Sequence, residues 1–485
     1  MEADPSGSGV VYTNVVVKDV YKSVFDADTI AGYSENSSAM KSLAVSLKTA
    51  SSSDTALVTG INDGKVTNLK PGYYMLVETE HTSADAYIAT DIILIAVDGT
   101  DDSTDGTYNN VTLKETRPTV EKKIVLEESS TNVAGTAGDL VDANVVAIGD
   151  TVTYQLESTI PKYPADAKNI TYTLTDTLSS GLTYANVSSI VITPSDGGNA
   201  TTYTVGGTND CTQWINTSSL SLGSGSFTIT VPSDAVLANG GATVTVTFTA
   251  KLNENASVGS TGNPNSVKLE YTNNWDKNTT YETSEDSVIT YTGTLTIEKV
   301  DSSSTATKLG GATFAIYSAK NHNVTVPSGN DNKGETSTLV VGEAPDEVTY
   351  YYYTTVTTAT GTGQATIEGL DKDTYYAVEL VALTGYSVDS TSQELILTVS
   401  GDSGLSLEEE GTVVTTSGNT NTADGNTVTW KVNSKDLEQI QNTKGTTLPG
   451  TGGIGTTLFT FGGLALVILA AVMFIVYTKK QRKQA

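Results

Sequence analysis

The sequence predicts an all-β protein, made of three β-sandwich domains in tandem and ending in a single membrane-spanning helix. Thr, Val, Ser, Gly and Tyr dominate the 485 residues, which is the composition of strands and turns. Apolar and polar residues alternate with a period of two in segments such as 149–159, 241–252 and 293–301. This alternation is expected of strands with one buried face, and immunoglobulin-like (Ig-like) sandwiches accommodate it.

Composition excludes several classes of function. The formal net charge is −28, so the chain is repelled by nucleic acid and we expect no nucleic-acid partner. Cys211 is the single cysteine, so no intrachain disulfide can form. Two histidines and one cysteine leave little for a zinc site or a Cys–His nucleophile pair. The acidic turns do not match the EF-hand spacing, so we predict no metal and no cofactor.

Breaks between successive strand patterns predict the domain boundaries. Arg117-Pro118 precedes a new strand, another strand pattern starts after Tyr291, and a short linker follows Lys444. The resulting domains are 8–116, 117–290 and 291–444, and the C-terminal segment is 445–485. Within the first domain, 37–48 is the one convincing helical pattern outside the membrane segment.

The C-terminal segment has the pattern of a membrane anchor. Residues 454–477 contain no charged side chain, and this length spans a hydrocarbon core of about 30 Å. Four basic residues follow directly: Lys479, Lys480, Arg482 and Lys483. The positive-inside rule places this tail in the cytoplasm and the rest of the chain outside. Residues 1–9 lack the apolar stretch of a signal peptide, so we expect that a signal was removed, which leaves open a truncated first domain.

A six-residue motif precedes the membrane segment. It reads Leu448-Pro449-Gly450-Thr451-Gly452-Gly453; proline bends the peptide and the glycines leave the Thr451 carbonyl unshielded. Motif, apolar span and basic tail together resemble the cell-wall sorting signal (LPxTG) of Gram-positive surface proteins. The resemblance implies that a sortase cysteine attacks Thr451, cleaves the Thr451–Gly452 bond and passes the acyl group to an amine. The chain would be a substrate of that enzyme.

The segment 108–125 resembles the junction between the first two domains of backbone pilins in sortase-assembled pili. In that family a lysine near the end of the first domain accepts the next subunit, and the matching position here is Lys114. Alternation around it turns its side chain outward, as an acceptor needs. The usual Tyr-Pro-Lys-Asn is Thr-Leu-Lys-Glu in this chain. Lys122 and Lys123 are the alternative acceptors.

The middle domain combines an inward lysine, an inward acid and an inward asparagine. Lys122 shares a strand face with Val120 and Ile124, Asp176 lies on an apolar face of the run 171–184, and Asn265 lies on one of 262–271. A buried ammonium must be paired, neutral or reactive. Desolvation favours a neutral amine and a protonated carboxyl, which suits an intramolecular isopeptide bond. Asn263 is the alternative partner, and a buried salt bridge or polar cluster is the alternative interpretation.

The domains that these residues resemble are the isopeptide-forming collagen-adhesin (Cna) types. The middle domain resembles the A-type, with Asp176 as the acid that promotes a Lys122–Asn265 bond. The third domain resembles the B-type in its strings 308–317 and 369–386, although Leu380 and Leu383 replace the usual Thr and Pro. Its implied residues are three: Lys299 and Asn442 for the bond, and Glu379 for the acid.

The first domain has a weaker version of this pattern. Its strand 72–78 carries Glu78, and Lys18 with Asn109 or Asn110 would complete a triad. No feature of the sequence sets their register, and we predict no isopeptide bond in this domain.

The combined pattern predicts a backbone subunit of a cell-surface pilus (fimbria), anchored in the cell wall after export and transient membrane attachment. The resemblance implies a pilus sortase, a housekeeping sortase, further copies of the chain and peptidoglycan as partners, with tip or basal pilins and a host surface ligand left open. The alternative is a monomeric wall-anchored adhesin. A wall-anchored hydrolase would need a catalytic constellation, and the sequence contains none.

Overall fold

The computed structural model describes residues 18–25, 38–51, 54, 56, 66, 72–78, 81–89, 93–97, 116–126, 138–164, 166–322, 324, 336–371, 374–389, 391–396 and 438–444. Two compact units are present. Unit 1 is Met1–Thr294 with Glu368–Lys372 and Thr398–Asn433, and unit 2 is Leu295–Ile367 with Asp373–Leu397 and Ser434–Ala485. The main segment of unit 1 ends at Thr294, and the predicted bounds of the three domains stay a prediction.

The described residues in the N-terminal part of unit 1 form a short 3-10 helix, an α-helix and a strand pair. Its elements are η1 (Asp19–Tyr21), α2 (Ser38–Ser51), β1 (Gly72–Leu76) and β2 (Ile93–Val97), and β1 pairs with β2 in antiparallel fashion. Leu43 and Leu47 lie four residues apart on α2 and pack beside Met75 and Leu94 of the strands. The helix predicted at 37–48 is therefore confirmed.

The remainder of unit 1 is built from two sheets. The first sheet has the order β4-β3-β6-β13-β8-β9, and the second β10-β12-β7-β14-β16-β5, with β11 beside β12 and β15 beside β14. The bounds are β3 (Val120–Val125), β4 (Leu140–Val141), β5 (Ala143–Val145), β6 (Thr151–Thr159), β7 (Tyr172–Leu178), β8 (Leu182–Thr193), β9 (Thr201–Tyr203), η2 (Thr212–Trp214), β10 (Ile215–Asn216), β11 (Leu220–Ser221), β12 (Ser224–Thr230), α3 (Ser233–Ala238), β13 (Thr243–Leu252), η3 (Gly259–Thr261), β14 (Asn263–Asn274), β15 (Thr279–Glu282) and β16 (Asp286–Tyr291).

The core of this sandwich follows from the period-two pattern. Alternate residues of β3, β6, β7, β13 and β14 are buried, and together they form one hydrophobic cluster. Aromatic rings link the two sheets at its centre: the Phe248 ring lies 5.1 Å from that of Tyr154 and 5.1 Å from that of Phe227. Cys211 is buried as a free thiol.

Unit 2 also contains two sheets. In the first, β17 lies between β18 and β22 and also pairs with β25; the second has the order β20-β21-β19-β23-β24. The bounds are β17 (Gly293–Asp301), β18 (Ser304–Lys308), β19 (Thr313–Ser318), β20 (Thr338–Val341), β21 (Val348–Thr357), β22 (Gln364–Leu370), β23 (Thr374–Val381), β24 (Gln393–Ile396) and β25 (Glu438–Asn442). The β17–β25 pairing is parallel, so strands far apart in sequence are direct neighbours.

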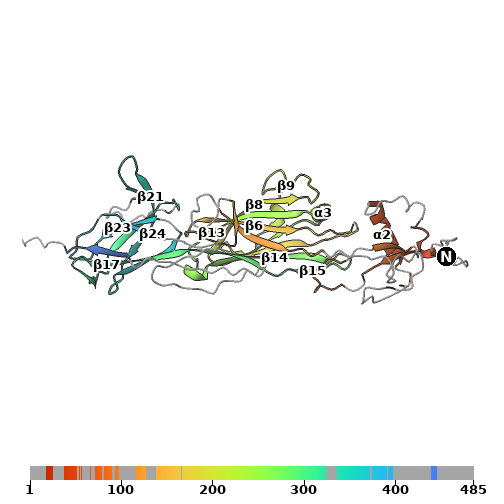
Figure 1. Ribbon diagram of the computed structural model, residues 1–485, viewed down its shortest axis with the longest axis horizontal. Coiled ribbons are helices and arrows are strands. Elements are labelled where there is room, and N and C mark those ends of the chain that lie inside the picture. The colour runs from red at the N-terminus through yellow and green to blue at the C-terminus, as the bar shows by residue number, and fades with distance from the viewer. Residues whose placement is uncertain are drawn as a thin grey trace, which may run out of the picture. The chain divides into compact units, whose positions relative to one another are not determined.

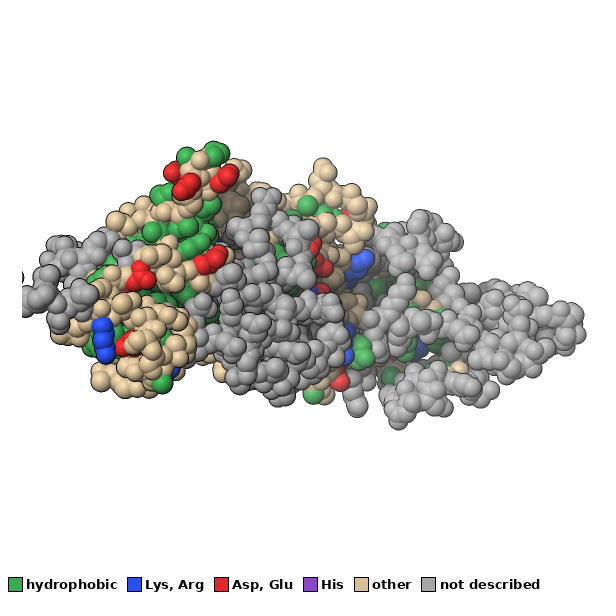
Figure 2. All heavy atoms as spheres, turned by 60° about the vertical axis from the view of Figure 1, so that its left-hand side comes forward, with side chains coloured by type: hydrophobic (Ala, Val, Ile, Leu, Met, Phe, Trp, Pro, Cys, Tyr) green, Lys and Arg blue, Asp and Glu red, His purple; other side chains and the backbone are tan. Residues whose placement is uncertain are grey.

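The tyrosine run 350–353 packs within the second sheet of unit 2, where Tyr350, Tyr352 and Tyr353 are buried. The hairpin that joins β20 to β21 projects from this sheet (Figure 1). Acidic and hydrophobic side chains gather on a projection of the surface in Figure 2. The connection 342–347 of this hairpin is exposed throughout and includes three acidic residues.

Three groups of predicted functional residues lie outside the described residues. They are the acceptor Lys114, the sorting motif at 448–452 and the apolar span 454–477. Within the part of the chain that the structure describes, no helix is long and apolar enough to cross a membrane.

Candidate functional site

The first candidate site crosses the sandwich of unit 1. Lys122 extends from β3 in one sheet, and Asp176 of β7 and Asn265 of β14 face it from the other. All three are at most 1 % exposed. The Lys122 Nζ donates a hydrogen bond to Asp176 Oδ2. The predicted inward faces of the three strands are confirmed by this burial.

Strand register brings the acid and the asparagine together. On β14, Val267 lies opposite Asp176 and Asn265 lies opposite Leu178, so acid and amide occupy neighbouring positions on one buried face. The Asn265 amide is close enough to lower the pKa of the Asp176 carboxyl. A bond between Lys122 and Asn265 would therefore join the two sheets covalently.

Hydrogen bonding distinguishes the two candidate asparagines. The Asn263 amide accepts a bond from the Ser257 N–H at 2.8 Å and donates to the carbonyls of Ser257 and Thr290 at 3.0 and 3.1 Å. Both side-chain polar atoms of Asn265, by contrast, are buried and form no hydrogen bond of normal distance and angle to any described residue, although the amide lies near Asp176 and Tyr154. A buried amide without well-formed hydrogen bonds is costly, so the Asn265 amide is the better candidate for the bond to Lys122.

Burial sets the ionisation of the pair. Desolvation lowers the pKa of Lys122, although Asp176 and Asp286 oppose this shift. Desolvation also raises the pKa of Asp176 to about 6, although Lys122 opposes it. The Lys122 Nζ lies 5.1 Å from the centre of the Tyr154 ring and 4.8 Å from that of Phe248, so aromatic faces surround the amine. Both shifts favour the neutral amine and the neutral acid that amide formation requires.

The pH dependence of a Lys122→Met variant tests this electrostatic interpretation. Folded Asp176 keeps a proton up to about pH 6, whereas an unfolded aspartate releases it near its ordinary value of 3.8. Stability should therefore fall as the pH rises through this window, by about 3 kcal/mol for a shift of about two units. The Lys122 cation lowers the pKa of Asp176. Its removal therefore raises this pKa and extends the fall in stability to higher pH. Denaturant midpoints from pH about 4 to about 8 measure it.

A Lys122→Met/Asp176→Asn double variant is the matched control, since it has no acid to titrate at this position. Its midpoint should fall less across the window, because the contribution of Asp176 is absent while other buried carboxyl groups, such as Glu379, still titrate. An equal pH dependence of the two variants would contradict the assignment of a protonated Asp176.

The second candidate site lies in unit 2. Lys299 of β17, Glu379 of β23 and Asn442 of β25 are at most 3 % exposed. The Lys299 Nζ lies 3.4 Å from Glu379 Oε2, and the Asn442 Nδ2 donates to Oε1 and Oε2 of Glu379 at 3.1 and 3.3 Å. Lysine and asparagine here belong to adjacent strands of one sheet, and the acid comes from the other sheet. All three predicted residues are thus in one cluster.

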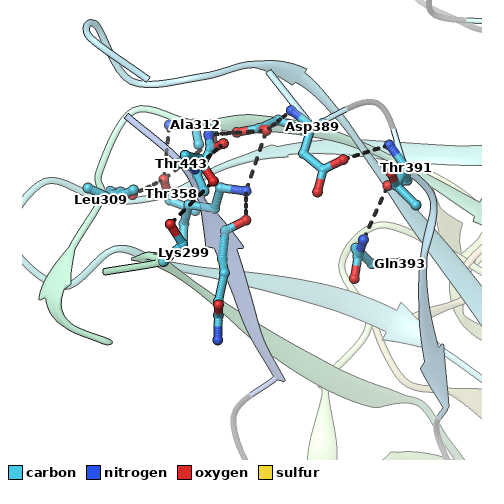
Figure 3. Close-up of polar contacts among 12 residues, drawn as sticks. Lys299, Leu309, Ala312, Thr358, Asp389, Thr391, Gln393 and Thr443 are labelled. Atoms are coloured by element: carbon cyan, nitrogen blue, oxygen red, sulfur yellow. Dashed lines mark hydrogen bonds and ion pairs between the residues drawn. The ribbon is translucent and has the colours of Figure 1, made fainter. Parts of the chain in front are cut away.

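Main-chain groups complete the second site (Figure 3). The Asp389 N–H donates to Glu379 Oε2 at 2.7 Å, and the Thr443 N–H donates to Asn442 Oδ1 at 3.1 Å. The latter bond points at the oxygen on which negative charge develops when an amine attacks the amide carbon. Desolvation lowers the pKa of Lys299 and raises that of Glu379, as in the first site.

The residues weighed for the first domain do not meet in this way. Lys18 is exposed, with its Nζ 2.8 Å from Asp54 Oδ2, and Glu78 Oε1 lies 2.8 Å from His81 Nδ1. Asn109 and Asn110 lie outside the described residues. The absence of a bond in this domain stays a prediction.

One residue of the first site escaped the sequence prediction. Asp286 of β16 is buried, and its Oδ2 accepts the main-chain N–H of Lys122 at 2.7 Å. Alternation in the run 286–290 places it on the same face as Val288 and Thr290, and this signal could have identified it as an inward-facing residue but not as the acceptor of the Lys122 N–H. Among the described residues, no cluster of His, Cys, Asp and Glu could hold a metal ion.

Three family models match separate parts of the chain. Residues 148–275 match the Gram-positive pilin backbone subunit 2, Cna-B-like domain; residues 293–411 match a prealbumin-like fold domain; and residues 440–484 match the LPXTG cell wall anchor motif. The first of these describes a Cna-B-like domain, so it does not support the A-type subtype of the middle domain, which stays a prediction.

Relatives of known sequence or structure are similar over most of the chain. The trypsin-resistant surface T6 protein of Streptococcus pyogenes serotype M6 is 26% identical over 405 residues, which cover 76% of this chain and 70% of that protein. The solved T6 backbone pilin is 20% identical, covers 78% of this chain and 81% of its own, and has a TM-score of 0.44. The group B streptococcus pilus 2b backbone protein is 25% identical, covers 63% and 97%, and has a TM-score of 0.39.

Tandem sandwiches with buried lysine–acid–asparagine clusters and a C-terminal wall anchor define a class of exported, wall-attached bacterial surface protein. Within this class the chain is identified as a Gram-positive backbone pilin with an LPXTG cell-wall anchor, as the sequence predicted.

Proposed function

We propose that the chain is the repeating subunit of a covalent surface fibre, in which Thr451 of one copy is joined to Lys114 of the next. A housekeeping sortase then attaches the completed fibre to peptidoglycan. The observation that carries this proposal is the wall-anchor match at 440–484, on a chain whose middle region matches a pilin backbone model. Copies joined head to tail do not close on themselves, so the product is an open filament.

The joining reaction exchanges one acyl bond for another. A sortase thiolate attacks the Thr451 carbonyl, the Thr451–Gly452 peptide bond breaks, and the C-terminal fragment leaves with a new amino group at Gly452. The neutral Lys114 amine of another copy then attacks the thioester. An amide forms, the enzyme thiolate is released, and the attacking nitrogen gives up one proton, which replaces the proton taken up by the leaving Gly452 nitrogen.

The surroundings of the alternative acceptors support Lys114. Lys122 is fully buried, so no enzyme can reach its amine. Lys123 forms ion pairs with Asp142 and Glu121 at 2.9 and 3.0 Å. Although desolvation lowers the pKa of Lys123, its hydrogen bonds to these carboxylates raise it above the ordinary value, so its amine is a poor nucleophile.

The two buried clusters are proposed to form intramolecular isopeptide bonds. In unit 2 the neutral Lys299 amine attacks the Asn442 amide carbon, Glu379 transfers a proton to the leaving amide nitrogen, and ammonia departs. Glu379 regains its proton from the attacking amine, so the acid is unchanged and one amide replaces another. The same steps in unit 1 join Lys122 to Asn265, with Asp176 as the acid.

These bonds suit a fibre under tension. Lys299 and Asn442 lie on β17 and β25, which are paired directly, and Asn442 is six residues before the sorting motif. Force that enters unit 2 at Thr451 would pass from β25 to β17 through a covalent bond. A disulfide adds about 2–4 kcal/mol but can be reduced, whereas an amide cannot.

Intact mass tests the two bonds. Each bond removes one ammonia, about 17 Da, so we expect a deficit of about 34 Da for the chain and of about 17 Da after either Asp176→Ala or Glu379→Ala. Asn263→Ala is the matched control and should keep the full deficit. A mass equal to that of the unmodified sequence would overturn this part of the proposal.

A further inference from the structure

The main chain at Lys122 lies at an incomplete edge of its sheet. Strand β3 pairs with β6 along its length, but β4 on the other side pairs only with Ile124 and Val125. The Lys122 N–H therefore has no strand partner on that side. A buried N–H without an acceptor is costly, so another part of the fold must supply one.

The acceptor is a carboxylate from the opposite sheet. Asp286 begins β16, is 3 % exposed, and accepts the Lys122 N–H on Oδ2 at 2.7 Å and the Ser287 N–H on Oδ1 at 3.0 Å. Asp286 and Asp176 both lie opposite Val267 of β14, one on each side of it. Lys122 thus interacts with two carboxyl groups from the strands that flank β14: Asp176 contacts its side chain, and Asp286 binds its main-chain N–H.

We propose that Asp286 is a positioning residue for the Lys122–Asn265 bond: it fixes the backbone of β3 against the opposite sheet, so that the amine faces the amide before the two react. This inference rests on the proposed isopeptide function.

Formation of the Lys122–Asn265 bond requires that the amine be held in the correct position relative to the amide. An amine reacts with an amide only from close, well-oriented contact, and a displacement of about 1 Å can cost up to about 100-fold in rate. The strand that carries Lys122 is anchored to the opposite sheet at this residue by Asp286. Desolvation raises the pKa of Asp286, although its hydrogen bonds from the main-chain N–H groups of Lys122 and Ser287 oppose this shift. With each carboxyl oxygen accepting one of these bonds, Asp286 is placed as an anchor of the main chain. Asp176 Oδ1, by comparison, is buried without a hydrogen bond to any described residue.

Timed cell-free synthesis of the full chain tests the inference. Samples are quenched in acid and digested with trypsin, which does not cleave after an acylated lysine. The branched peptide that joins Lys122 to Asn265 is then quantified against the linear peptides. We expect Asp286→Ala to slow its formation about 10-fold, and Asp286→Asn, which keeps an acceptor oxygen, to restore a rate close to that of the unchanged chain.

Asp150→Ala is the matched control. Asp150 is also a buried carboxylate of this sandwich and accepts a main-chain N–H, from Ala147 at 3.2 Å, but that group is not part of β3. The unit 2 bond between Lys299 and Asn442 is an internal reference in each sample. A selective slowing in Asp286→Ala, rescued by Asp286→Asn, supports the inference. Equal rates in Asp286→Ala and Asp150→Ala, or no rescue, would overturn it, whereas absence of the branched peptide from the unchanged chain would overturn the proposed bond itself.

Discussion

Replacement of Lys114 by alanine will abolish the high-molecular-weight ladder that cells expressing this chain show after boiling in SDS. The proposed fibre has one acceptor amine per subunit, so its loss stops growth at the first step. We expect the residual polymer to fall below about 1% of that in the unchanged chain, because removing a nucleophile leaves no comparable route. Gel electrophoresis with immunodetection measures the ladder.

Lys123→Ala is the matched control, since Lys123 is a nearby lysine that is paired with Asp142 and Glu121. Its ladder should be unchanged. A single wall-linked species that is indifferent to Lys114→Ala would instead indicate the wall-anchored adhesin. Loss of the ladder in Lys123→Ala alone would move the acceptor to that residue.

The sequence predicts the buried clusters well because strand periodicity is strict. Since successive side chains point to opposite faces, one inward residue fixes the direction of every other residue in the strand. Lys122 follows Val120 by two residues, Asn265 precedes Val267 by two, and both pairs are buried as expected. Glu379 and Asn442, which the family resemblance implied, are also buried in unit 2.

Periodicity could not distinguish residues that share a face. Asn263 and Asn265 both point inward, and only the folded chain shows that the Asn263 amide is occupied by Ser257 and Thr290. Asp286 was missed for a related reason. Its acceptor role depends on the edge at which β4 stops pairing with β3, and a single strand pattern does not contain this information.

The two sites also differ in which sheets carry the lysine and the asparagine, and the sequence motifs do not reveal this difference. In unit 1 the lysine and asparagine belong to different sheets, so a bond would join the layers of the sandwich. In unit 2 they belong to paired strands of one sheet, so a bond would reinforce an existing parallel ladder. The first arrangement resists separation of the layers, and the second resists sliding of β25 along β17. A fibre under tension loads both.

Glu379→Ala should have the largest effect on stability. Without this acid the Lys299–Asn442 bond does not form, and the unfolded chain regains the freedom of a long loop. A cross-link across a loop of this size is worth about 5 kcal/mol, which corresponds to a decrease in Tm of about 10–20 °C for a domain of this size. The variant also leaves Lys299, which is buried, without its carboxylate, a further cost. Calorimetry measures the decrease, and single-molecule pulling should show unit 2 extending at forces that the unchanged chain withstands.

Glu298→Ala separates loss of the bond from loss of a buried glutamate. Glu298 is buried on the same strand as Lys299, but it pairs with Lys308 and accepts a hydrogen bond from Gln439 at 2.8 Å. This variant should lose the stability of one polar cluster yet retain its mass deficit and its resistance to pulling, because the acid beside Asn442 is intact. Glu379→Gln should behave like Glu379→Ala in mass, since an amide cannot give the leaving nitrogen a proton. If Glu379→Ala kept the deficit, proton transfer by this residue would be wrong, and the cluster would be an ion pair that stabilises unit 2 without reacting.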